Sequence, residues 1–161
     1  MAPVKTSTLE GDLLLRGVWE SLGLPRCLVT GGYVFMPLTK NYADRSGWRS
    51  RLTYLISEYY NTLYDKYEGM EQLVVLSRVL RHDSTRYRDY QNALVRTVNG
   101  KRPKDFAEFV SLLEGAERAV IVFEGVNPQP LILDKAKIAE VHQAILDQYG
   151  IRKDRHVKEG K

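Results

Sequence analysis

The amino-acid sequence predicts a mainly α-helical domain of the α+β class that carries two short β-hairpins. Apolar residues recur at three- and four-residue spacing along most of the chain, which is the pattern of amphipathic helices. Only two stretches are rich in β-branched and aromatic residues and interrupted by turn-forming glycine or proline, the pattern of hairpins. Because the helical stretches outnumber the hairpins, helices are expected to form most of the core.

The first half of the chain is predicted to hold two helices and one hairpin. Ser7-Thr8-Leu9-Glu10 has the capping-box pattern that begins a helix, expected over about 8–22. Gly31-Gly32 separates two β-prone runs, which predicts a hairpin over 26–36. The clearest helical spacing covers about 44–67, with Trp48, Leu52, Leu55, Ile56, Tyr59, Leu63 and Tyr67 on one face.

The second half is predicted to end in a hairpin and a helix. Three helices are expected before that hairpin, over about 70–82, 84–98 and 104–115. Residues 118–123 form the most β-prone run, and 131–133 return after a turn over 125–130. Asp134 would cap a last helix over about 135–149. Three helices, a two-stranded hairpin and a helix follow the element order of a winged helix, with the turn as its wing.

Length and composition are typical of one globular domain. Of the 161 residues, 43% are hydrophobic and 27% are charged, which excludes a chain too polar to fold. The domain is expected to span 1–150, either undivided or in two parts, 1–68 and 69–150. A basic, solvated tail is expected over 151–161.

The single cysteine and the absence of long apolar runs bear on the compartment. Cys27 cannot form an internal disulfide, so an oxidising compartment is not implied. No run of 18 apolar residues is present and the first residues lack a secretory signal, so no membrane span is expected. An intracellular location is therefore expected, either cytoplasmic or within a nucleoprotein particle. Cys27 lies in an apolar, β-prone run and is expected to be buried and slow to react.

The sequence contains no recognisable catalytic motif. Glycine-rich phosphate loops, paired cysteines and the helical zinc motif are all absent, so no catalytic residue, metal or cofactor is expected. A nuclease would use Glu124, Asp134 and Lys137 to hold Mg²⁺, but their order does not fit the usual strand-borne arrangement. An enzyme of unfamiliar type remains one alternative.

Positive charge is concentrated in one part of the chain. Between Arg78 and Lys104 there are eight basic residues against two acidic ones, in a chain whose net charge is +4. On the expected helix over 84–98, Arg88, Asn92 and Arg96 share an exposed face, a pattern that favours contact with a phosphate backbone. The candidate nucleic-acid-binding residues are Arg78, Arg81, Arg86, Arg88, Asn92, Arg96, Lys101, Arg102 and Lys104.

Two tyrosines are candidates for an interface. Tyr60 and Tyr64 lie four residues apart, away from the middle of the apolar face of the expected helix, where they could stack on bases or contact a partner. The preferred hypothesis is a non-enzymatic, nucleic-acid-associated assembly or packaging protein, viral or ribonucleoprotein, bound to RNA or DNA or inside a larger protein assembly. The alternative is a protein-binding subunit or inhibitor that acts through its Arg- and Tyr-rich helices. Oligomerisation is compatible with either hypothesis.

Overall fold

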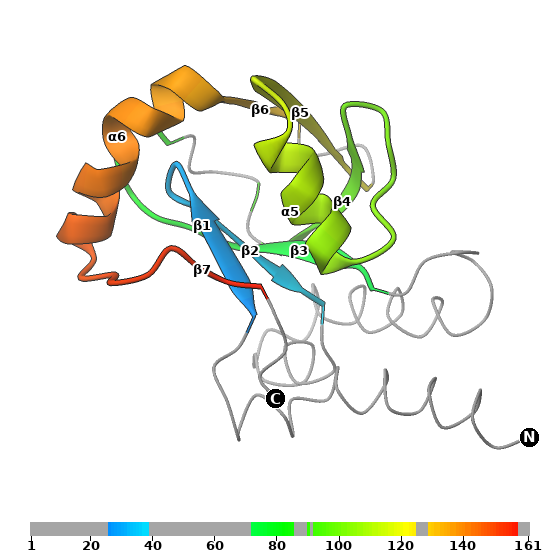
Figure 1. Ribbon diagram of the computed structural model, residues 1–161, viewed down its shortest axis with the longest axis horizontal. Helices are drawn as coiled ribbons and strands as arrows, with labels where there is room; N and C mark the ends of the chain where they lie inside the picture. The colour runs from blue at the N-terminus through cyan, green and yellow to red at the C-terminus, as the bar shows by residue number, and fades with distance from the viewer. Residues whose placement is uncertain (1–25, 39–71, 86–89, 91, 125–128, 158–161) are drawn as a thin grey trace, which may run out of the picture.

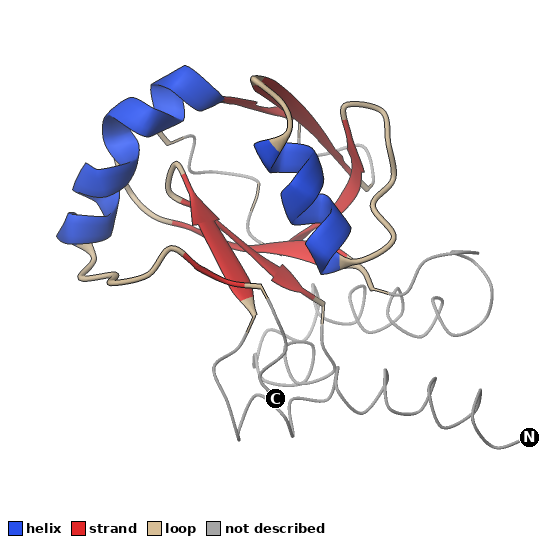
Figure 2. Cartoon of the chain, in the orientation of Figure 1, coloured by secondary structure: helices blue, strands red, loops and turns tan. Residues whose placement is uncertain are grey.

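The computed structural model describes residues 26–38, 72–85, 90, 92–124 and 129–157. Within these residues, seven strands form one antiparallel sheet in the order β6-β5-β4-β3-β2-β1-β7. The described strands are β1 (Cys27–Thr30), β2 (Tyr33–Pro37), β3 (Val74–Val79), β4 (Ala93–Val98), β5 (Arg118–Phe123), β6 (Leu131–Asp134) and β7 (Arg155–His156). The described helices are α5 (Phe106–Glu114) and α6 (Lys135–Gln148), and Figure 2 shows how sheet and helices are arranged.

The expectation of a mainly α-helical fold with two hairpins is wrong, and so is the winged-helix order. Residues 74–79, expected in one helix, form β3, and residues 93–98, expected in the next, form β4. The described part of the chain is therefore organised around the sheet. The helices expected over 8–22 and 44–67 lie outside the described residues.

Two physical features of these strands explain the error. β3 is buried along almost its whole length, so it lacks the alternation that marks a half-buried strand. β4 has an irregular register between Val95 and Thr97 where it pairs with β5, as a β-bulge produces. Because of this shift, Leu94, Val95 and Val98 are buried at a spacing that also fits a helix.

The elements with strong local signals form where the sequence places them. The β1–β2 hairpin turns at Gly31 and Gly32, whose φ angles of 56° and 90° are left-handed and suit glycine. Strands β5 and β6 pair as the expected second hairpin. Helix α6 begins at the expected cap, because the Asp134 carboxylate accepts the N–H groups of Ala136 and Lys137.

Helix α5 is held against the sheet by aromatic rings. Phe106 and Phe109 are fully buried, and the Phe109 ring lies 4.8 Å from the ring of Phe35 on β2. Asp105 caps the helix by accepting the Glu108 N–H at 2.7 Å. Figure 1 shows α5 lying over the sheet and α6 near the β1–β2 turn.

Helix α6 packs against the main core cluster through Ile138 and against the hairpin through its last turns. Its Ile145 and Leu146 form a small buried cluster with Val29 of β1 and Leu80. Strands that are distant in sequence are neighbours in the sheet, since β2 pairs with β3. At the start of the connection between these two strands, the Leu38 N–H donates to the carbonyl of Leu73 at 2.7 Å.

Candidate functional site

A groove lies at the β1–β7 end of the sheet, between strand and helix. A cavity of about 330 Å³ lies here between β1, the end of α5 and the first half of α6. β1 contributes residues 28–30 to its lining, α5 contributes Leu113 and Glu114, and α6 contributes Ile138 and His142. The groove thus combines an apolar floor with charged groups at its rim.

Strand β7 lies along the outer side of β1 (Figure 1), and its Arg155 lines the cavity. The two strands are antiparallel, with Leu28 opposite Arg155. The ladder continues past β7, because the Val29 N–H donates to the carbonyl of Asp154 at 2.6 Å. β1 is therefore the last strand but one at this end of the sheet, and a short segment from a distant part of the chain pairs with its outer side.

Ionic contacts tie this segment to both helices. The Arg155 guanidinium contacts the Glu114 carboxylate on α5 and donates from Nε to Asp154 Oδ1 at 3.2 Å. The His142 ring on α6 lies with its Nε2 3.0 Å from Asp154 Oδ2. Burial alone would raise the pKa of the Asp154 carboxyl, but hydrogen bonds from Arg155 and His142 outweigh it and leave that pKa below its ordinary value. The hydrogen bond to Glu114, followed by that to Asp154, raises the pKa of Arg155.

Cys27 lies at the same edge and is half-buried. Burial raises the pKa of its thiol. The backbone N–H of His156 opposes that rise by hydrogen bonding to the sulfur, and the charge of Asp154 adds to it. The reactivity of Cys27 therefore depends on the strand that pairs with β1.

The opposite edge of the sheet is β6, which borders a larger cavity. This cavity, of about 550 Å³, is lined by Tyr33, Tyr90, residues 130–134 and the start of α6, including Lys137. Ile132 of β6 is 49% exposed. Both ends of the sheet thus adjoin a cavity, and of these two cavities the one at β1 and β7 is lined by the end of α5.

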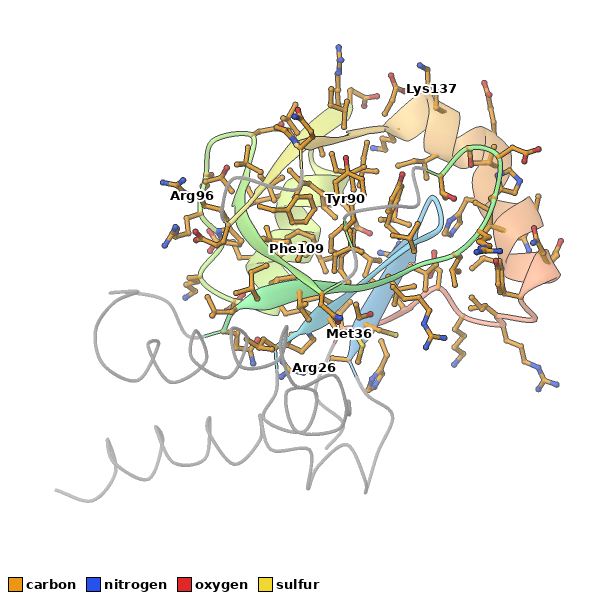
Figure 3. All side chains as sticks on the ribbon, turned by 180° about the vertical axis from the view of Figure 1, so that it is seen from behind. Arg26, Met36, Tyr90, Arg96, Phe109 and Lys137 are labelled. Carbon is orange, nitrogen blue, oxygen red and sulfur yellow. The ribbon has the colours of Figure 1, made fainter. Side chains whose placement is uncertain are left out.

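The basic residues singled out in the sequence do not lie on one helical face. Arg78 and Arg96 are exposed on β3 and β4, and Arg81 is exposed after β3. Asn92 precedes β4 with a left-handed φ of 64°. Figure 3 shows Arg96 pointing away from the sheet, whereas Tyr90 and Phe109 point inward. The face that Arg88, Asn92 and Arg96 would share does not exist, because residues 93–98 are a strand.

Carboxylates partner the basic loop that follows β4. Lys101 pairs with Glu108 at 3.1 Å, and Arg102 with Glu124 at 3.0 Å. The backbone N–H of Lys104 donates to Glu108, and this bond, with the Lys101 side chain, lowers the pKa of Glu108. The side chains of Lys101 and Arg102 are thus paired within the domain. Four further candidates, Arg86, Arg88, Tyr60 and Tyr64, lie outside the described residues.

The comparison with protein families identifies this architecture. The model of the PDZ domain matches residues 22–157, which cover all seven described strands and both described helices. The chain belongs to the PDZ domain family. The hypothesis of a nucleic-acid-associated packaging protein is thereby overturned, since the PDZ family points to a protein-interaction domain. The alternative hypothesis of a protein-binding subunit agrees better with the PDZ family. The support for it comes from the family match and not from the Arg- and Tyr-rich helices on which the hypothesis was based.

A similarity to a curated protein agrees with the family. The chain is 26% identical over 138 residues to the protein named putative protease Do-like 12, mitochondrial, from Arabidopsis thaliana. The match covers 84% of this chain and 24% of that relative. The chain thus spans about a quarter of the relative's length.

Sequence reasoning missed the residues that form the groove. Glu114, His142, Asp154 and Arg155 are distant in sequence and come together only through the β1–β7 pairing. The one local signal was Asp154-Arg155-His156, two charged residues and a histidine inside a stretch interpreted as a solvated tail. No three His, Cys, Asp or Glu residues within the described ranges are grouped closely enough to hold a metal ion. None of the described helices is long and apolar enough to cross a membrane.

Proposed function

We propose that this PDZ domain binds an extended segment of a partner protein at the edge of β1, in the groove that faces α5. PDZ domains take peptides by β-strand addition, in which main-chain hydrogen bonds supply affinity and pockets for alternate side chains supply specificity. The observation that carries the proposal is the structure of the β1 edge. Its backbone N–H at Val29 points outward and is satisfied by an added antiparallel strand.

The groove offers both parts of such a binding site. Leu28 and Val29 supply a strand edge, and Leu113 and Ile138 supply apolar surface beside it. An apolar side chain of a partner can be buried there, while its backbone completes the sheet. Glu114 on α5 and His142 on α6 place polar groups at the rim, where they can select a partner by charge.

We further propose that the chain serves as the partner-binding part of a larger protein. The relative carries the name of a putative protease, and the match covers 24% of it. A domain of this kind would recruit an extended segment of a substrate or regulatory protein rather than cleave a bond. The peptides that the groove selects would then indicate the substrates of that larger protein.

The test is selection of peptides by the full chain, followed by binding measurements. A library of displayed peptides, presented with free carboxyl ends and as internal segments, is selected on the protein. Selected peptides are then titrated by fluorescence anisotropy. Backbone amide shifts are expected to change along β1 and α5 on binding.

Matched variants locate the site. Leu113→Lys places a charge in the groove and is expected to weaken binding at least tenfold. Ile132→Lys introduces the same charge on β6, where the side chain is already 49% exposed, and is expected to leave binding unchanged. Circular dichroism checks that both variants fold. Binding abolished by Ile132→Lys and unaffected by Leu113→Lys would place the site at the β6 edge and refute the proposal.

A further inference from the structure

We infer that residues 154–157 are an internal ligand of the β1 groove, which a partner peptide must displace, and that the groove selects segments of matching chemistry. That chemistry is an acidic residue, then a basic residue, then an aliphatic residue two positions later. The identity of the groove as the binding site rests on the function proposed above. The occupant itself is observed in the structure.

The backbone of the segment pairs as an added strand. It runs antiparallel to β1, with Cys27 opposite His156 and Leu28 opposite Arg155. The Val29 N–H donates to the Asp154 carbonyl at 2.6 Å. This is the geometry in which β-strand addition satisfies an edge. An incoming peptide therefore needs the same hydrogen-bonding groups that residues 154–157 already use.

The side chains of the segment occupy distinct positions around the groove. In an extended strand, Arg155 and Val157 lie on one face because side chains alternate. On that face, Arg155 contacts Glu114 at the end of α5, and Val157 packs against the main core cluster. Asp154 reaches His142 on α6. Each of these contacts is a feature by which the groove can distinguish one segment from another.

A short tether makes the segment an effective competitor. Helix α6 ends at Gln148, so only residues 149–153 separate it from Asp154. A segment held by such a short connection acts at an effective concentration on the order of millimolar. A partner peptide of similar intrinsic affinity must compete with the tethered segment. Its apparent affinity is its intrinsic affinity multiplied by the fraction of molecules whose groove is open.

Release of the segment can be measured without any partner. Cys27 is the single cysteine of the chain, and its sulfur is hydrogen-bonded by the His156 N–H. Arg155→Glu and Val157→Asp are expected to raise the rate of thiol labelling at Cys27 and the exchange rate of the Val29 amide. Lys153→Glu makes the same charge change as Arg155→Glu at an exposed neighbour and is expected to alter neither rate.

A charge swap separates release from simple damage. Arg155→Glu places two carboxylates together, and adding Glu114→Arg restores an ion pair of reversed sense. The double variant is expected to recover slow labelling. Thermal unfolding checks that each variant is folded, and Arg155→Glu replaces Val157→Asp if the latter unfolds.

The ligand role is tested by supplying the segment in trans. A fluorescent peptide copying residues 151–161 is titrated by anisotropy into the full chain. It is expected to bind the Val157→Asp variant about tenfold more tightly than wild type, because the variant's groove is open in most molecules. The same peptide carrying Val157→Asp is expected not to bind.

The outcomes distinguish this inference from the proposed function. Equal Cys27 labelling in wild type and both variants, or equal peptide affinity for wild type and Val157→Asp, would refute the internal ligand. Selected partner peptides that bind wild type as tightly as the opened variant would do the same, while supporting the proposed function. Release of the segment and its binding in trans, with no partner peptide ever selected, would support the internal ligand and count against the proposed function alone.

Discussion

Replacing Phe109 by alanine should remove the contact that holds α5 to the sheet. The Phe109 side chain is fully buried. Its ring lies 4.8 Å from that of Phe35 and 6.2 Å from that of Phe106. Deleting a buried phenylalanine typically costs ~3–5 kcal/mol through lost transfer free energy and the cavity left behind. A loss of about 4 kcal/mol is expected here, because three rings share the site.

The consequence for the groove follows from the length of α5. A helix of 9 residues is too short to persist without tertiary contacts. Phe109→Ala is therefore expected to weaken peptide binding as well as to lower the free energy of unfolding.

Urea unfolding monitored by circular dichroism measures the change. With a slope of ~2 kcal/mol per molar urea, a loss of about 4 kcal/mol lowers the midpoint by ~2 M. The control is Ser111→Ala, an exposed position on the same helix, expected to change stability by less than ~0.5 kcal/mol. A loss below ~1.5 kcal/mol for Phe109→Ala would refute the view that the aromatic cluster anchors α5.

Three other predictions concern turns, caps and pH. Gly100→Ala should lower the free energy of unfolding by ~1 kcal/mol through the left-handed backbone alone. Gly32→Ala should lower it clearly more, because the new Cβ would lie 2.6 Å from the Thr85 methyl carbon. Thermal unfolding of the two variants compares these losses. Asp134→Ala should cost ~1 kcal/mol by uncapping α6, and Asp134→Asn should restore most of it. The pKa of Asp154 in the folded protein lies below its ordinary value of 3.8. The contribution of the Asp154 carboxylate to stability should therefore be complete above pH 3.8 and lost as the pH falls through the lower folded pKa. Exchange of the amide that donates to the Asp154 carbonyl should show this loss in wild type and not in Asp154→Asn.

Local chemistry made part of the fold predictable. Gly31-Gly32 and Asp134 act through their own backbone angles and nearby N–H groups, so the first hairpin and the last helix were placed correctly. β3 and β4 were not, because burial on both faces and an irregular register remove the alternation on which strand prediction depends. The overall class failed with these two strands.

The groove could not be predicted for a different reason. Cys27 and His156 lie at opposite ends of the matched region, and no local pattern indicates that they pair. Strand β7 has only 2 residues, which is too few for a recognisable strand pattern in the sequence. The Arg102–Glu124 pair shows the same limit, since Arg102 appeared as free positive charge in the sequence and is paired with a residue that follows β5. The intracellular location expected from the lone cysteine stays a prediction.

The hydrogen bond between Leu38 and Leu73 holds together the two points between which residues 39–71 are inserted. The end of β2 and the start of β3 are neighbours in the sheet, so the two ends of the segment 39–71 lie close together. For a flexible connection between neighbouring points, the entropic cost of closure grows only logarithmically, about 0.6 kcal/mol for each doubling of its length. This position is therefore a graft site, where evolution or an engineer can exchange one inserted segment for another while the strand register stays the same.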